Sequence, residues 1–216
     1  MMRKSFHESL RDLKNDMLKM SSMVEDSINK SVHALKDGDL GLAQQVKDED
    51  DKIDDMEIIL EEKCTKLIAL QQPVAKDLRM IIVISKLVTD LERIGDHASN
   101  IANMVLEIGG QPLIKPLIDI PRMTELVTRR LRESIDSFVN MDIVLAKKVA
   151  LEDEEIDVID EQILRELLTF MMEDPRTIKQ ATSLMFISRF LERIGDHSTN
   201  ICERVVYMIS GEREAY

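Results

Sequence analysis

The sequence is poor in the residues that make turns and aromatic cores. Its 216 residues include no tryptophan, seven glycines and five prolines, and aromatic residues make up 3% of the chain. So few turn-forming residues imply long elements, and the many alanine, leucine, isoleucine, methionine, glutamate and lysine residues favour helices. The two cysteines, Cys64 and Cys202, argue against a secreted fold held by disulfides and favour a reducing compartment.

Long apolar runs and an excess of positive charge are also missing. The longest apolar stretch, near Ile81–Ile84, is far too short to span a bilayer, and the charged residues 1–10 lack the apolar core of a secretory signal. We therefore expect a cytoplasmic protein with no direct membrane insertion. The formal net charge of −12 excludes a nucleic-acid binder, which needs a basic surface, but it would attract cations.

Helical periodicity fills most of the chain and is interrupted at a few points. Turns are expected at Lys36–Asp39, Gln71–Val74, Asn140–Asp142 and Asp174–Pro175, and Gly109–Pro121 is a linker. Between them, apolar residues recur in the heptad steps of a left-handed helical bundle. The sequence thus predicts an all-α protein with six helices, at residues 3–36, 40–71, 74–108, 121–139, 143–172 and 175–210.

The chain contains an internal duplication. The string LERIGDH occurs at Leu91–His97 and again at Leu191–His197, 100 positions later. Earlier positions match at an offset of 103, as Ile53 matches Ile156. Short turns imply antiparallel neighbours. We expect two tandem three-helix up-down-up bundles, at residues 1–108 and 121–216, joined by a linker at 109–120.

The duplicated string places acidic residues beside the packing seam. Leu91 and Ile94 follow the seam, and Glu92, Asp96 and Asn100 follow each other in steps of four. Steps of four drift slowly around a helix, so these three residues form one stripe on the outward side of the bundle. A solvated face is the usual explanation for such acids.

A second acidic pair is also duplicated, on the second and fifth predicted helices. The neighbouring pair Asp51 and Asp55 is lost, because its partners at an offset of 103 are Glu154 and Val158. Both kept pairs flank the seam, so they could meet the acids of the adjacent helix. The kept residues are Asp50, Asp54, Asp153 and Asp157.

The repetition favours a metal site over a solvated face. Like charges four residues apart destabilise a helix by about 0.2–0.5 kcal/mol per pair, and Gly95 and Gly195 each cost about 1 kcal/mol relative to alanine. Facing carboxylates suit a hard or borderline cation, and oxygen ligands accept Mg, Mn, Fe, Ca or Zn. His97 and His197 point about 100° away from the preceding acid, so we expect supporting or ordinary polar contacts from them.

At DLERIGDHASNIA and FLERIGDHSTNIC the chain resembles the PhoU family of phosphate-uptake regulators. The likeness extends over nearly the whole chain and includes the duplication, the segment QQPVAKDLRMI before the third helix, and the linker. It implies two three-helix bundles that each carry a pair of acidic motifs.

The resemblance also implies multinuclear iron or zinc clusters on the bundle surface. By motif, the first carboxylate site consists of Asp50, Asp54, Glu92 and Asp96. By motif, the second carboxylate site consists of Asp153, Asp157, Glu192 and Asp196. No catalytic residue and no other cofactor site is implied.

The function implied by the resemblance is negative regulation of phosphate uptake and of the phosphate-starvation response. The implied partners are the ATPase subunit of a phosphate ABC transporter and a membrane sensor histidine kinase. The resemblance also allows for a homodimer, although the sequence does not fix the oligomeric state.

Two other functions compete with this one. A carboxylate-bridged di-iron oxidase needs Glu-x-x-His pairs, and a helical phosphohydrolase needs His before Asp, whereas His97 and His197 follow Asp96 and Asp196. No nucleophile–base pair or glycine-rich phosphate loop is visible either. A plain helical scaffold, in which the acids serve only solubility, is the third hypothesis.

Overall fold

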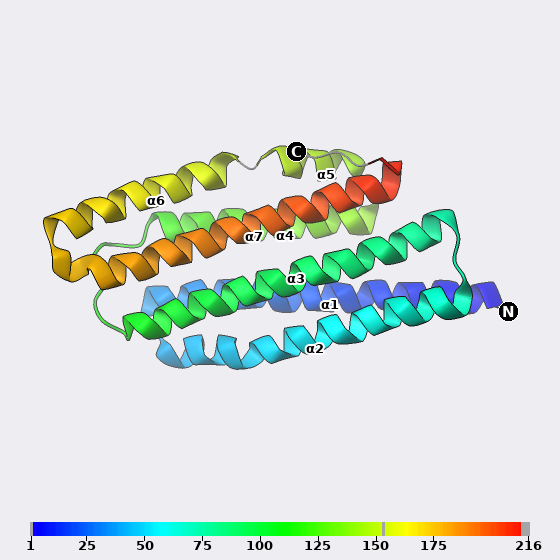
Figure 1. Ribbon diagram of the computed structural model, residues 1–216, viewed down its shortest axis with the longest axis horizontal. Coiled ribbons are helices and arrows are strands. Elements are labelled where there is room, and N and C mark those ends of the chain that lie inside the picture. The colour runs from blue at the N-terminus through cyan, green and yellow to red at the C-terminus, as the bar shows by residue number, and fades with distance from the viewer. Residues whose placement is uncertain (1, 153, 213–216) are drawn as a thin grey trace.

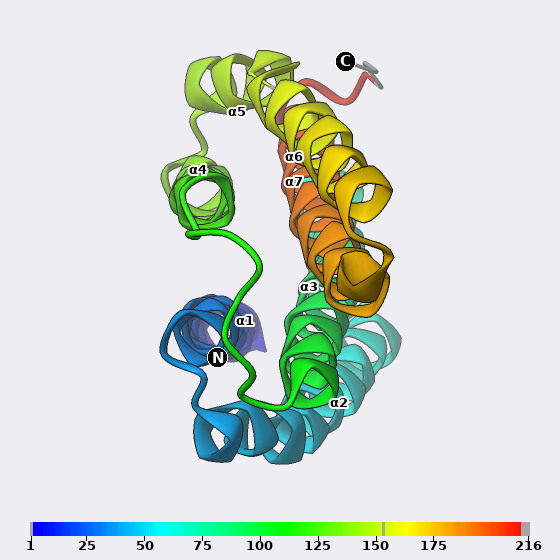
Figure 2. The ribbon, with the colours of Figure 1, turned by 90° about the vertical axis from the view of Figure 1, so that its left-hand side faces the viewer.

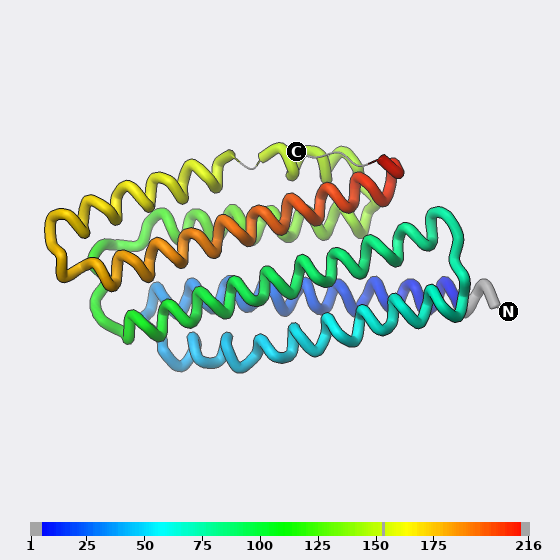
Figure 3. The backbone as a smooth tube through the Cα atoms, viewed as in Figure 1, coloured from blue at the N-terminus to red at the C-terminus, as the bar shows by residue number. Residues whose placement is uncertain are grey.

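The computed structural model describes residues 2–152 and 154–212, which contain helices and no strand. Long helices lie side by side along the molecule (Figure 1), and the chain runs up and down between its ends (Figure 3). The all-α prediction is therefore confirmed. The elements are α1 (Met2–Asp37), α2 (Leu40–Gln71), α3 (Ala75–Ile108), α4 (Asp119–Asn140), α5 (Ile143–Leu151), α6 (Glu154–Glu173), the 3₁₀ turn η1 (Pro175–Thr177) and α7 (Ile178–Ser210).

The expected turns are present and repeat the same capping chemistry. Asp39 caps α2 by accepting a hydrogen bond from the Leu42 amide at 2.9 Å, and Asp142 caps α5 by accepting from Leu145 at 3.0 Å. Such caps satisfy amides that the first helical turn leaves unpaired. Asp174 does the same before Pro175 at η1. The duplication thus extends to the turns.

The fifth predicted helix, residues 143–172, is wrong in one respect, because it forms two helices. α5 ends at Leu151 with Glu152 as its C-cap, and α6 begins at Glu154. The first turn of α6 contains Glu154, Glu155 and Asp157. Acidic side chains stabilise a helix N-terminus through its dipole, so this run of acids suits a helix start better than a helix interior.

The equivalent acidic run in α2 stays helical, and two lysines lie beside its Glu49. Lys30 Nζ lies 3.0 Å from Glu49 Oε2, and Lys52 Nζ lies 3.6 Å from Glu49 Oε1. At an offset of 103, the positions of Lys30 and Lys52 hold Glu133 and Glu155. The second half therefore uses other cations, since Arg122 lies 3.1 Å from Glu155 and Lys148 lies 3.6 Å from Glu152.

The two halves share one continuous hydrophobic core. The most extensive helix contact in the molecule joins α3 to α7, and α1 also contacts α4. Seen along the helices, α7 lies above α3 and α4 above α1, with α2 and the α5–α6 pair at opposite ends (Figure 2). Neither half buries its apolar surface alone.

Charged and aromatic side chains cross the contact between α3 and α7. Asp90 is 1% exposed, and its carboxylate lies 2.6 Å from Arg204 Nε and 3.3 Å from His197 Nδ1. The His97 ring lies 5.7 Å from the His197 ring and 5.8 Å from the Phe190 ring. Burial and the neighbouring His197 lower the pKa of His97 to about 4. The duplicated histidines thus hold the two halves together.

Both cysteines are buried free thiols. Burial raises the pKa of Cys64 to about 11 and that of Cys202 to about 12. Over the described residues, none of the helices has the length and apolar character required to cross a membrane.

We expect Asp90→Asn to lower the free energy of unfolding by about 3 kcal/mol. Breaking a buried ion pair leaves the other charges poorly compensated, and the partial exposure of Arg204 sets the low end of the usual range. The measurement is a urea titration at pH 7.5 with a constant m-value.

The control is Glu161→Gln, which removes an ion pair to Arg165 whose two side chains are each 69% exposed. We expect it to change stability by no more than about 0.5 kcal/mol. Equal effects of the two substitutions would show that Asp90 does not join the halves.

Candidate metal centre

The site is built on a close approach of α2 to α3 at Gly95. A Cβ atom on residue 95 would lie 3.1 Å from both Cδ1 and Cγ2 of Ile53. The same holds in the other half, where a Cβ atom on residue 195 would lie 3.1 Å from Cδ1 of Ile156. The glycine therefore makes room for an isoleucine side chain, and this contact brings the acids on either side of it together.

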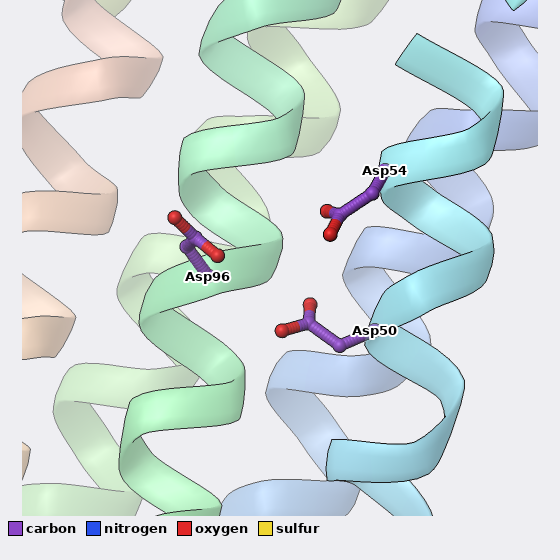
Figure 4. Close-up of side chains that lie close together, drawn as sticks. All are labelled: Asp50, Asp54 and Asp96. Carbon is purple, nitrogen blue, oxygen red and sulfur yellow. The ribbon is translucent and has the colours of Figure 1, made fainter. Parts of the chain in front are cut away.

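Three aspartates from two helices converge beside this contact. Asp50 and Asp54 extend from α2 towards α3, where Asp96 lies opposite them (Figure 4). One carboxylate oxygen from each lies within 4.8 Å of the others. Among the described residues, no second group of three potential metal ligands meets this closely. We call Asp50, Asp54 and Asp96 the aspartate cluster.

Burial and neighbouring carboxylates make Asp50 and Asp54 harder to ionise. Burial raises the pKa of Asp50, with further contributions from Asp96 and Asp54, although a hydrogen bond from Ser99 opposes the shift. Burial and the same neighbours raise the pKa of Asp54. A cation placed among them would remove this repulsion.

Glu92 lies at the edge of the cluster. Burial, followed by the neighbouring Asp96, Glu57 and Asp54, raises its pKa to about 7 against the opposing effect of Arg93. Asp96 and Asn100 are exposed as the outward stripe predicts, but Glu92 is partly covered. The first carboxylate site thus consists of three converging aspartates and one adjacent glutamate.

The second carboxylate site has a different environment. Glu192 is only 8% exposed, so its side chain does not face solvent as the outward stripe predicts. Its Oε1 lies 2.9 Å from Arg189 Nη1, and Arg189 also lies 3.5 Å from Asp160 Oδ2. Ser188 donates a hydrogen bond to Asp160 at 2.5 Å. These contacts tie Glu192 to a cationic side chain.

The remaining members of the second site lie on α6 and α7 and at residue 153. Asp196 Oδ2 lies 4.0 Å from Arg193 Nη1, Asp157 is exposed on α6, and Asp153 lies outside the described residues. Burial and the neighbouring Asp196 raise the pKa of Glu192 to about 7, against the effect of Arg189 and Arg193.

Sequence reasoning did not place Arg189 and Asp160 at the site. The repeat contained a signal for Asp160, because Asp160 matches Glu57 at an offset of 103. Arg189 had no such signal, since its equivalent at an offset of 100 is Thr89. The similarity of the two halves therefore points to Asp160, whereas only their difference points to Arg189.

We expect Gly95→Ala to destabilise the protein by about 1 kcal/mol. Overpacking costs about 1–3 kcal/mol, and the better helix propensity of alanine returns about 1 kcal/mol of it. The measurement is a double-mutant cycle with Ile53→Val, which deletes the Cδ1 atom and should restore part of the loss. A stabilised Gly95→Ala variant, or one with no coupling to Ile53→Val, would contradict the packing role.

We expect Glu92→Gln to raise the melting temperature of the metal-free protein at pH 8, with a gain that vanishes towards pH 4. The unfolded glutamate has a pKa of about 4.3, whereas the folded one has a pKa of about 7. Stability from the retained proton is therefore present below the unfolded pKa and lost as the pH rises through the folded pKa. A neutral glutamine escapes this loss. The control is Glu61→Gln at an exposed position of α2, and equal pH profiles for both variants would contradict the prediction.

Comparison with known proteins agrees with this architecture. The PhoU domain family matches residues 17–105 and 120–205. The "Phosphate-specific transport system accessory protein PhoU homolog" of Pseudomonas aeruginosa is 42% identical over 209 residues, which span 95% of this chain and 86% of the relative. The Aquifex aeolicus homolog is 43% identical, over 95% of this chain and 93% of the relative.

Solved structures show the same fold. The crystal structure of PhoU from Pseudomonas aeruginosa superposes with a TM-score of 0.92 at 41% identity, over 96% of this chain and 100% of that one. The phosphate transport system regulatory protein PhoU from Streptococcus pneumoniae gives a TM-score of 0.91 at 30% identity, over 98% of this chain and 100% of that one. The matched fold, the two matched domains and the full-length relatives show that the chain belongs to the PhoU family.

Proposed function

We propose that this chain is an accessory regulator of phosphate transport that binds metal ions through its surface carboxylates and restrains phosphate uptake and the phosphate-starvation response. Family membership supports the transport role, because the relatives are named accessory proteins of a phosphate-specific transport system. The convergence of Asp50, Asp54 and Asp96 within 4.8 Å is the observation that carries the metal-binding role.

The residues present fit a metal ion. Three carboxylates on two helices supply oxygen ligands for a hard or borderline cation. Burial, and then the neighbouring carboxylates, raise the pKa values of Asp50 and Asp54, and a cation bound there would favour their ionised forms. Asp50, Asp54 and Asp96 would hold the metal in the first half, with Glu92 beside them. Several carboxylates can bridge more than one ion, which suits the multinuclear iron or zinc clusters that the resemblance implies.

Bound metal would fix α2 to α3 and present a locally neutralised surface. Metal binding also contributes to folding free energy, because the ligands come together only in the folded chain. The role supported here is therefore that of an adaptor without catalysis, in agreement with the names of the relatives. As partners we propose the ATPase subunit of a phosphate ABC transporter and a membrane sensor histidine kinase. We also propose that the protein acts in the cytoplasm and assembles as a homodimer.

Elemental analysis of untagged protein tests the metal-binding role. We expect wild-type protein to bind iron, zinc or manganese and Asp50→Asn/Asp54→Asn to lose the metal of the first half. The matched control is Asp51→Asn/Asp55→Asn, which removes the same charge from the same helix on the exposed side. Equal metal content in all three proteins would refute a site at the aspartate cluster.

The same variants test the regulatory role in a strain whose own copy of the gene is deleted. With phosphate in excess, we expect wild-type protein and the control variant to repress a phosphate-starvation reporter and Asp50→Asn/Asp54→Asn to leave it active. Unchanged repression by all three would separate regulation from metal binding. If deletion of the gene leaves the reporter activity unchanged, the regulatory role is contradicted.

A further inference from the structure

The two halves match in the sequence positions of their acids but differ in their cations. In the second half, Arg189 of α7 lies 2.9 Å from Glu192 and 3.5 Å from Asp160. In the first half, Thr89 occupies the equivalent position and forms a hydrogen bond with Glu57, the equivalent of Asp160. A neutral hydroxyl group thus stands where the second half has a guanidinium.

A second guanidinium lies behind Gly195. Arg130 of α4 is 1% exposed and donates hydrogen bonds to Thr199 Oγ1 at 2.9 Å and to the Val149 carbonyl at 3.3 Å. Its Nη1 lies 3.8 Å from the point where a Cβ atom on residue 195 would be. The equivalent residue at an offset of 103 is Ser27, so the first half has no buried cation here.

The nearby arginines compensate the negative charge of Glu192 only in part. Its Oε2 is buried and accepts no hydrogen bond from the described residues, and Arg193 Nε, at 3.8 Å, is beyond hydrogen-bond reach. Arg189 is 51% exposed, so its side chain can move into solvent at modest cost. Glu192 Oε2 therefore lacks a hydrogen-bond donor among the described residues. The donor at Oε1 is an arginine whose side chain can move away.

We propose that the two carboxylate sites are unequal, with Arg189 as a built-in counter-ion that competes with a divalent cation for Glu192, so that the first site fills before the second. This inference rests on the proposed metal-binding function. A cation that binds Glu192 through both carboxylate oxygens must displace the guanidinium from Oε1, whereas a cation entering the aspartate cluster displaces no positive side chain of those described. Because a charged hydrogen bond contributes on the order of tenfold in binding, Arg189 should weaken the second site by about that factor.

Titration of the metal-free protein with Mn²⁺ alone, followed by isothermal calorimetry, tests this order. We expect two classes of site in the wild type. Asp50→Asn/Asp54→Asn should remove the tighter class and leave the weaker one. In that background, Arg189→Thr, which installs the first-half residue, should tighten Mn²⁺ binding by about tenfold.

Three further variants complete the design. Arg189→Lys keeps the charge and should bind Mn²⁺ like the wild type. Thr89→Arg should weaken the tighter class in an otherwise unchanged chain. The matched control is Arg165→Thr, which removes an arginine that is 69% exposed on α6, and it should leave both classes unchanged. Circular dichroism shows that each variant is folded before it is titrated.

The outcomes separate this inference from the proposed function. If the wild type binds Mn²⁺ but Arg189→Thr behaves like Arg165→Thr, the inference is wrong and metal binding stands. If the wild type binds no Mn²⁺, the unequal filling is refuted, and metal binding is refuted as well when the elemental analysis also finds no iron or zinc. Two equal classes in the wild type would also overturn the inference.

Discussion

The contact between Gly95 and Ile53 is the constraint on which the candidate site depends. A long bundle helix holds its neighbour at a distance set by the side chains between them, and a glycine is the one residue that lets an isoleucine sit against the helix backbone. With α2 this close, acids one turn apart on α2 face an acid on α3. The same arrangement recurs at Gly195 and Ile156, so the repeated string is first a packing element, and its acids are brought near those of the neighbouring helix through that packing.

This packing brings carboxylates close together, an arrangement that helix stability alone would disfavour. The pKa values of Asp50, Asp54 and Glu92 are all raised, which means that the folded chain resists ionising them together. The two halves compensate this charge differently, since Arg189 pairs with Glu192 in the second half and Thr89 takes its place in the first. A counter-ion from outside the chain is therefore needed most at the aspartate cluster, where the protein supplies none among its described residues.

Much of the fold follows from the sequence because the duplication repeats each signal. The caps at Asp39 and Asp142, the heptad seam and the linker predict the helices, and Asp50, Asp54 and Asp96 meet as their matched spacing predicts. The break after Leu151 escapes prediction because an acidic run is compatible with a helix interior, as in α2, and with a helix start, as in α6. The burial of Glu192 and its pairing with Arg189 escape prediction because both depend on how neighbouring helices cover one face of α7.

The contact between α3 and α7 has the reciprocity of a symmetric dimer. His97 packs against residue 190 and His197 against residue 90, which is the pattern that a two-fold axis imposes on identical subunits. In a true dimer both positions would have to hold the same residue. Joining the halves in one chain removes that requirement, so one position can be the buried Asp90 and the other Phe190. The fusion thus keeps the geometry of a dimer while allowing each half its own chemistry.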